Sequence, residues 1–415
     1  MSNNEIEIGD TSVEPSHYND FEDKISELSQ DIPYEDFFQG YLLTNRPCKI
    51  NKFVTEFWEC RTNWLTGSKP NLFYFREYCG DAEVPVADCR EREYNSQKKK
   101  MYTLHKYLDY LEEYISESHP STKPNLYLKD WHLTRDFPNL AVYRVPKYFA
   151  SDWLNEYFTS RSDLNDDYRF VYIGPKGSWT PLHADVFTSY SWSVNVVGRK
   201  RWLLFPPGEE MHLRDRFGNL AYDATAEDIF DKTNYPSCDR PGKCYDVIQE
   251  AGEAIFVPSG WHHQVWNLED TISVNHNWVN GCNIMQIWQA LSSSLLAVQK
   301  EVSDCTDMDD WHSHCQLMLR ATHGLSYEEF YDLLQCIAQP RIMYIKGDCP
   351  VKMYGNWILG HNHAVWDLKQ ISKTLKHFLV DKNLTYLPWV GTKNPFGLLE
   401  NIDNLLKTTG VLPGP

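Results

Sequence analysis

The sequence lacks long apolar segments, a secretion-type N-terminus and an excess of positive charge. Its 415 residues contain no apolar run near the roughly 18 that a membrane helix needs, so no membrane span is expected. The first residues carry neither a basic start nor an apolar stretch, which predicts no secretory signal. Lys and Arg number 40 against 57 Asp and Glu, a net charge of −17. This balance argues against direct, non-specific binding of nucleic acid.

Cysteine pairs of the zinc-binding or redox type are also missing. The 11 cysteines form no CxxC pair, and the nearest spacing is Cys238 to Cys244. We interpret them as buried or free thiols in a reducing compartment, with the cytoplasm expected and the nucleus as the alternative. A zinc site built from Cys305, His312, His314 and Cys315 is disfavoured, because no second CxxC or HxxxH pair completes it.

Composition and hydrophobic periodicity change three times along the chain. Residues 1–30 are acidic and polar and are expected to be flexible, and 31–124 read as a helical or mixed lead-in with an exposed loop at 81–100. Short apolar or alternating runs separated by Gly and Pro turns fill 125–282, which predicts an antiparallel β-sandwich or barrel. Helical periodicity returns in 283–415, whose helices are a candidate docking or dimer surface.

Two local signals mark helix starts. Thr103 is expected to be an N-cap, because Leu104 and Leu108 begin an apolar stripe at helical spacing after it. Ser326 with Glu329 has the spacing of a capping box. Helices are therefore expected both before and after the β-rich region.

Two residues in TPLHAD carry the first chemical signal. His183 and Asp185 are two apart, so on a strand both side chains point to the same face. One imidazole and one carboxylate make up two thirds of the facial triad that suits iron(II) and leaves positions open for a co-substrate and dioxygen. Alone the tripeptide is weak, since it also fits a surface segment. The strand after VPSGWHH, about 80 residues downstream, can supply the third ligand.

Lys200 is the second signal. It lies on the strand after the Gly198–Arg199 turn and could return toward the metal. A buried lysine is costly unless it meets an anion, which a dicarboxylate co-substrate would provide. The last strand also has a polar face, unusual for core packing, formed by Thr271, Ser273, Asn275 and Asn277.

Three linked motifs carry a family resemblance. They are T-x-x-H-x-D at 180–185, G-R-K-R-W-L-L-F-P-P at 198–207 and V-P-S-G-W-x-H-x-V-x-N-L-x-x-T-I at 257–272. In this order they resemble the JmjC family of iron(II)- and 2-oxoglutarate-dependent oxygenases, over roughly residues 30–285. The resemblance implies an α+β protein with a double-stranded β-helix, or cupin-type jelly-roll, core. It implies Fe(2+) as metal, with 2-oxoglutarate and dioxygen as co-substrates.

The resemblance also assigns roles. His183, Asp185 and His263 match the metal ligands, and Lys200 matches the residue that pairs with the far carboxylate of 2-oxoglutarate. Further matches to the co-substrate site are Thr180, Tyr127 and Asn275.

Two positions depart from the family pattern. Ser193 stands where an asparagine is frequent, and Asn195, on the same strand face, is expected to substitute for it. His262 replaces an aromatic residue and could assist at the metal in place of His263.

The resemblance is strongest to a branch associated with lysyl hydroxylation of the translation release factor. We therefore expect a protein lysyl hydroxylase that promotes translation termination, with the release factor as its protein partner. Histone N-methyl-lysine demethylation is the alternative within the family, although no zinc-finger reader pattern accompanies it. A catalytically inactive cupin-type binding module is the second alternative, and three competent ligand positions count against it.

Overall fold

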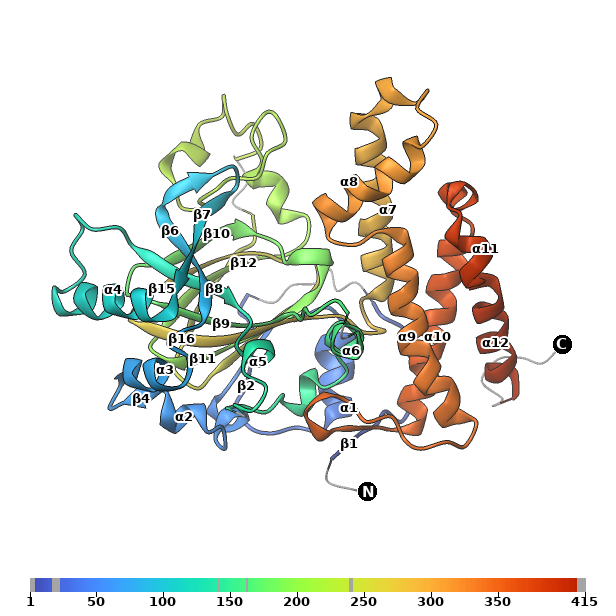
Figure 1. Ribbon diagram of the computed structural model, residues 1–415, viewed down its shortest axis with the longest axis horizontal. Coiled ribbons are helices and arrows are strands. Elements are labelled where there is room, and N and C mark those ends of the chain that lie inside the picture. Colours follow the sequence, from blue (N-terminus) through green and yellow to red (C-terminus); the bar gives the residue numbers. More distant parts are fainter. Residues whose placement is uncertain (1–3, 17–22, 141, 162, 239–241, 409–415) are drawn as a thin grey trace.

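The fold is a β-sheet core flanked on one side by the C-terminal helices, as Figure 1 shows. The computed structural model describes residues 4–16, 23–140, 142–161, 163–238 and 242–408.

Two sheets make up the core. The larger sheet has nine strands in the order β2-β3-β14-β11-β16-β9-β8-β6-β7, and the smaller one has the order β10-β15-β12-β13. The strands of the larger sheet are β2 (Ser26–Leu28), β3 (Cys48–Ile50), β6 (Glu83–Glu93), β7 (Ser96–Thr103), β8 (Leu126–Trp131), β9 (Arg169–Gly174), β11 (Tyr190–Val197), β14 (Ala254–Val257) and β16 (Thr271–Trp278). Those of the smaller sheet are β10 (Trp179–His183), β12 (Lys200–Phe205), β13 (Tyr245–Gln249) and β15 (His262–Asn267).

The eight strands from β9 to β16 divide equally between the two sheets. This arrangement confirms the expected α+β class with a jelly-roll core. Strand β11 shows how the sequence specifies it. Trp192 and Val194 enter the main apolar core, whereas Ser191 and Ser193, on the opposite face, line an internal cavity.

The expected exposed loop at 81–100 is wrong. These residues form most of the β6–β7 hairpin, which extends the larger sheet through β8. On β6 the side chains of Val84, Val86 and Cys89 are buried, while Pro85 and Asp88 are partly exposed. Three consecutive lysines lie on β7, the edge strand of the sheet, where charge discourages pairing with another chain.

The N-terminal segment is also more ordered than expected. Strand β1 (Glu5–Ile6) pairs in parallel with β17 (Ile358–Leu359), and Ile6 and Ile8 are buried. The Glu7 carboxylate accepts hydrogen bonds from the backbone amides of Asn362 and His363, at the N-terminus of helix α10 (His361–Leu379). The expectation of flexibility for residues 1–3 and 17–22 lies outside the described residues.

The helices expected around the core are present. The lead-in contains α1 (Tyr34–Phe37), α2 (Cys60–Asn63), α3 (Leu72–Cys79) and α4 (Leu104–Ser116), and α5 (Leu133–Asp136) and α6 (Trp153–Ser160) precede β9. The C-terminal region contains α7 (Ile284–Glu301), α8 (Trp311–His323), α9 (Tyr327–Ile345), α10, α11 (Trp389–Lys393) and α12 (Pro395–Thr408). Thr103 caps α4, and Ser326 with Glu329 forms the capping box of α9. Among the described residues, no helix has the length and apolar character required to cross a membrane.

A buried ionic network joins the C-terminal helices to the core. The Arg341 guanidinium on α9 donates to Asp367 on α10 at 2.7 Å and to Glu156 on α6 at 2.8 Å. His363 Nδ1 lies 3.1 Å from the other Asp367 oxygen, and Tyr34 OH is 2.8 Å from His363 Nε2. The network therefore connects α1, α6, α9 and α10.

We expect Arg341→Met to destabilise the protein by about 3–5 kcal/mol, because it leaves two largely buried carboxylates without their cation. Arg320→Met is the matched control, since Arg320 pairs with Glu329 while 58% of its side chain is exposed, and it should cost at most about 1 kcal/mol. Urea unfolding of both variants measures the difference, and equal losses would contradict a stabilising role for the buried network.

Candidate metal and co-substrate site

Strand pairing brings three metal-type ligands together. His183 ends β10, Asp185 follows it at the start of a short turn, and His263 lies on β15 directly opposite His183 in the β10–β15 ladder. One donor atom from each residue lies within 4.8 Å of the others, and His263 Nε2 is 3.9 Å from Asp185 Oδ2. Two imidazoles and one carboxylate at this separation fit the 2-His-1-carboxylate site of iron(II).

Hydrogen bonds orient each of these side chains. His183 Nδ1 lies 2.8 Å from the Pro181 carbonyl and His263 Nδ1 lies 3.2 Å from that of Trp261. A carbonyl only accepts, so each Nδ1 carries the proton and each Nε2 presents its lone pair. Burial, and next the neighbouring His263, lower the pKa of His183 to about 4, which keeps it neutral at neutral pH.

The carboxylate ligand also has a supporting contact. Ser191 Oγ donates to Asp185 Oδ2 at 2.6 Å, from the adjacent face of β11. Partners of this kind hold a ligand in position and raise metal affinity. The serine was not singled out from the sequence, because its contact depends on the packing of β11 beside the turn.

His262 points away from the three ligands. Its Nδ1 lies 3.8 Å from Glu210 Oε2, and successive residues of a strand face opposite sides. Among the described residues, the group of donors that could hold a metal ion contains His183, Asp185 and His263 but not His262. The geometry therefore favours His263 over His262 as the third ligand.

A cavity of about 370 Å³ adjoins the three ligands. The co-substrate residues expected from the sequence lie on its wall at Tyr127, Thr180, Lys200 and Asn275. Lys200 is 2% exposed, and its Nζ donates to Tyr127 OH at 3.3 Å. Burial, with a further contribution from Lys129, lowers the pKa of Lys200 to about 7. Such a site is suited to an anion that would restore the ammonium form.

Asn195 does not reach this cavity. Its amide donates to the Gly198 carbonyl at 2.6 Å, so it supports the turn between β11 and β12. The expectation that Asn195 substitutes for the family asparagine at the co-substrate is therefore wrong. Ser193 itself occupies the wall at that position.

Lys129 is the main residue that the sequence analysis missed. It is buried on β8, and its Nζ donates to Gln97 at 3.1 Å and to Thr180 Oγ1 at 3.5 Å. Burial, partly offset by Asp130, lowers the pKa of Lys129 to about 8. Its position two residues after Tyr127, on the same strand face, was the available signal. The cavity thus contains two buried lysines, more positive charge than one carboxylate requires.

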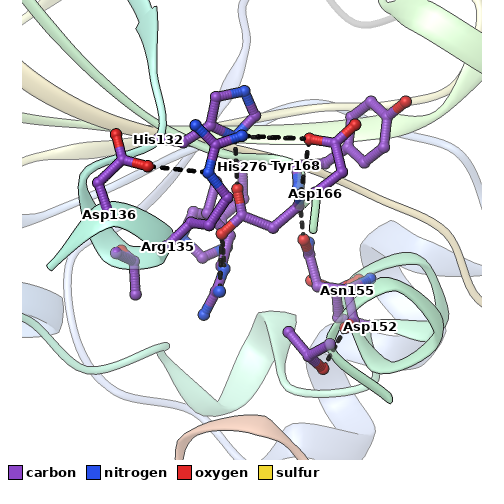
Figure 2. Close-up of polar contacts among 12 residues, drawn as sticks. His132, Arg135, Asp136, Asp152, Asn155, Asp166, Tyr168 and His276 are labelled. Carbon is purple, nitrogen blue, oxygen red and sulfur yellow. Dashed lines mark hydrogen bonds and ion pairs between the residues drawn. The ribbon is translucent and has the colours of Figure 1, made fainter. Parts of the chain in front are cut away.

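A second group of metal-type donors lies at the start of β9, where His132 and Asp166 approach each other (Figure 2). His132 Nδ1 is 2.6 Å from Asp167 Oδ1, and Arg169 donates to the other Asp167 oxygen at 2.7 Å. The Arg135 guanidinium nitrogen Nη1 lies 3.7 Å from Asp166 Oδ1. Because guanidinium groups already neutralise both carboxylates, we interpret this group as a structural ion-pair network.

Comparison with known proteins agrees with this geometry. The cupin-like domain model matches residues 34–284. The chain is 46% identical to the 2-oxoglutarate and iron-dependent oxygenase JMJD4 of Gallus gallus, over 91% of this chain and 89% of that protein. It is 49% identical to the Homo sapiens protein of the same name, over 82% and 81%. The Arabidopsis thaliana arginine-specific demethylase JMJ20 is 40% identical, over 73% of this chain and 67% of that protein.

The chain therefore belongs to the cupin-like family of iron- and 2-oxoglutarate-dependent oxygenases. The metal and the co-substrate expected from the sequence are those of this family, and the donor set and the buried lysines fit both.

We expect His263→Ala to reduce metal affinity by more than the roughly 10–100-fold that loss of a supporting residue costs, because it removes a direct ligand. His262→Ala is the matched control on the same strand and should bind metal as the wild type does. Anaerobic titration with Mn(II) or Fe(II) measures both, and a greater loss in His262→Ala would reverse the assignment.

We also expect 2-oxoglutarate to bind with proton uptake at pH 8. With pKa values of about 7 and about 8, Lys200 is mostly neutral and Lys129 about half neutral at that pH, and the dicarboxylate favours their charged forms. At pH 6 both are already charged, so uptake should be small. Calorimetry of the metal-loaded protein in two buffers of different ionisation enthalpy measures this. Uptake that is absent at pH 8 would contradict the placement of the co-substrate beside the lysines.

Proposed function

We propose that this chain is a protein hydroxylase that acts on a lysine side chain of the translation release factor and so promotes translation termination. The observation that carries the oxygenase chemistry is one cavity containing both the His183–Asp185–His263 group and the buried Lys200. With iron and 2-oxoglutarate bound, such a site couples the decarboxylation of 2-oxoglutarate to the oxidation of a C–H bond by dioxygen.

The residues of this chain have separate tasks in that reaction. His183, Asp185 and His263 would hold the metal, and the backbone carbonyls behind the two histidines keep their lone pairs aimed at it. Lys200 and Tyr127 would bind the far carboxylate of 2-oxoglutarate, with Thr180 and Asn275 on the adjoining wall.

A macromolecular substrate is supported by the position of the cavity mouth. The β6–β7 hairpin contributes Gln97 and Lys99 to the wall, and Tyr94 at its turn is 93% exposed. The hairpin thus projects beside the cavity, where it can contact a protein surface. We place the reaction in the cytoplasm, where translation termination occurs.

Demethylation is the second candidate, because a relative is named an arginine-specific demethylase. Both reactions begin with oxidation of a carbon beside or within a cationic side chain. They differ in outcome, since hydroxylation of an aliphatic carbon leaves the oxygen on the protein, whereas oxidation of an N-methyl group releases formaldehyde.

Intact-mass and fragment analysis of the release factor tests the proposal. After incubation with the enzyme, iron, ascorbate and 2-oxoglutarate, we expect a gain of one oxygen on a lysine, and no gain without 2-oxoglutarate or with His183→Ala. Methylated histone peptides bearing lysine or arginine serve as the parallel substrates. No gain on the release factor, together with loss of a methyl group from such a peptide, would support demethylation instead.

A further inference from the structure

One carboxylate on the cavity wall has no role in the chemistry described above. Among the described residues, the cavity is lined by the acidic side chains of Asp130 and Asp185 alone, against the basic side chains of Lys99, Lys129 and Lys200. If Asp185 binds the metal, Asp130 is the anion that remains for a substrate.

An irregular backbone turns Asp130 toward the cavity. In a regular strand Lys129 and Asp130 would face opposite sides, yet both line the cavity. Asp130 has a φ of 61°, in the left-handed region, and the β8–β9 register shifts between Leu128 and Trp131. Bulges of this kind redirect a side chain, and non-glycine residues with positive φ cluster at functional sites.

The Asp130 carboxylate has two partners. Tyr172 OH donates to Oδ1 at 2.6 Å, and the Lys99 ammonium of β7 forms a short ion pair with Oδ2. The Asp130 side chain is 33% exposed and that of Lys99 is 44% exposed, so the pair lies at the cavity mouth. Lys99 therefore presents a lysine ammonium, from the chain itself, at the carboxylate.

We propose that Asp130 receives the cationic end of the substrate side chain, in the position that the Lys99 ammonium occupies in the free protein. This inference rests on the proposed lysine substrate and names the group that would recognise it. Tyr172 holds the carboxylate on the cavity wall, where the ammonium of an entering side chain can reach it.

Charge supports exchange of one ammonium for another. A substrate cation that replaces Lys99 leaves the local charge unchanged, whereas one that adds to Lys99 would place two ammonium groups at the single Asp130 carboxylate. Lys99 can leave at small cost, because partly solvated ion pairs contribute little. Edge strand β7 lets its side chain move back into water without disturbing the sheet.

Binding of a small probe tests the proposal without turnover. The protein is loaded with Mn(II) and 2-oxoglutarate under anaerobic conditions and titrated with Nα-acetyl-lysine amide or Nα-acetyl-norleucine amide, with binding followed by NMR. We expect the wild type to prefer the lysine probe and Asp130→Asn to bind it roughly tenfold or more weakly, because a charge-assisted contact is lost. Asp246→Asn is the control, since Asp246 is an exposed partner of Arg201 outside the cavity wall.

Lys99→Ala separates recognition from a structural role of the ion pair. If Lys99 occupies the substrate position, this variant should bind the lysine probe as tightly as the wild type or more tightly, opposite to Asp130→Asn. If the pair only stabilises the hairpin, both variants should lose affinity together. Parallel losses, or equal binding of the two probes by the wild type, would overturn the proposal.

Hydroxylation of the release factor then distinguishes this inference from the proposed function. With both correct, Asp130→Asn should raise the KM for the release factor at least about tenfold while its affinity for 2-oxoglutarate stays near that of the wild type. Asp130-dependent lysine binding without hydroxylation would leave this inference standing and remove the release factor as substrate. Hydroxylation of the release factor that Asp130→Asn does not affect would support the release factor as substrate and contradict this inference.

Discussion

The antiparallel register of β10 with β15 is the constraint on which the site depends. It sets His183 opposite His263, and the turn after β10 then places Asp185 beside both. A shift of one residue in β15 would set His262 opposite His183 in place of His263. The His262 side chain lies on the other face of the strand, toward Glu210. Within the jelly roll, backbone carbonyls orient the two histidines and the Ser191 hydroxyl orients Asp185.

Burial of Lys200 and Lys129 is the second constraint, and it has a cost that the fold alone does not offset. Each loses hydration, and a neighbouring ammonium disfavours the charged form of each, Lys129 for Lys200 and Lys99 for Lys129. In the free protein their contacts are mainly neutral oxygens, from Tyr127, Gln97 and Thr180. A dianion would offset this cost on binding, so the buried lysines preorganise the cavity for a dicarboxylate.

Linked motifs allowed much of this to be predicted from sequence, and packing explains the rest. The spacing of His183 and Asp185 and the GWHH turn indicated three residues that the structure brings together, because strand and turn chemistry is local. Asn195 was assigned wrongly, since strand alternation alone cannot show that its amide bonds the Gly198 carbonyl. The β6–β7 hairpin was missed because a polar edge strand has the composition of a loop. Its pairing partner, β8, lies more than 20 residues away in sequence.

Asp130, which departs from the side-chain alternation of a regular strand, lies where the cavity meets solvent. The jelly-roll segment from β9 to β16 supplies His183, Asp185, His263 and Lys200, whereas Lys99, Lys129 and Asp130 come from the lead-in hairpin and β8. Strand β8 links the two groups, because it carries Tyr127, which contacts Lys200, as well as Lys129 and Asp130. The left-handed residue at Asp130 is tolerated because the flanking strands β6 and β9 fix β8 on both sides.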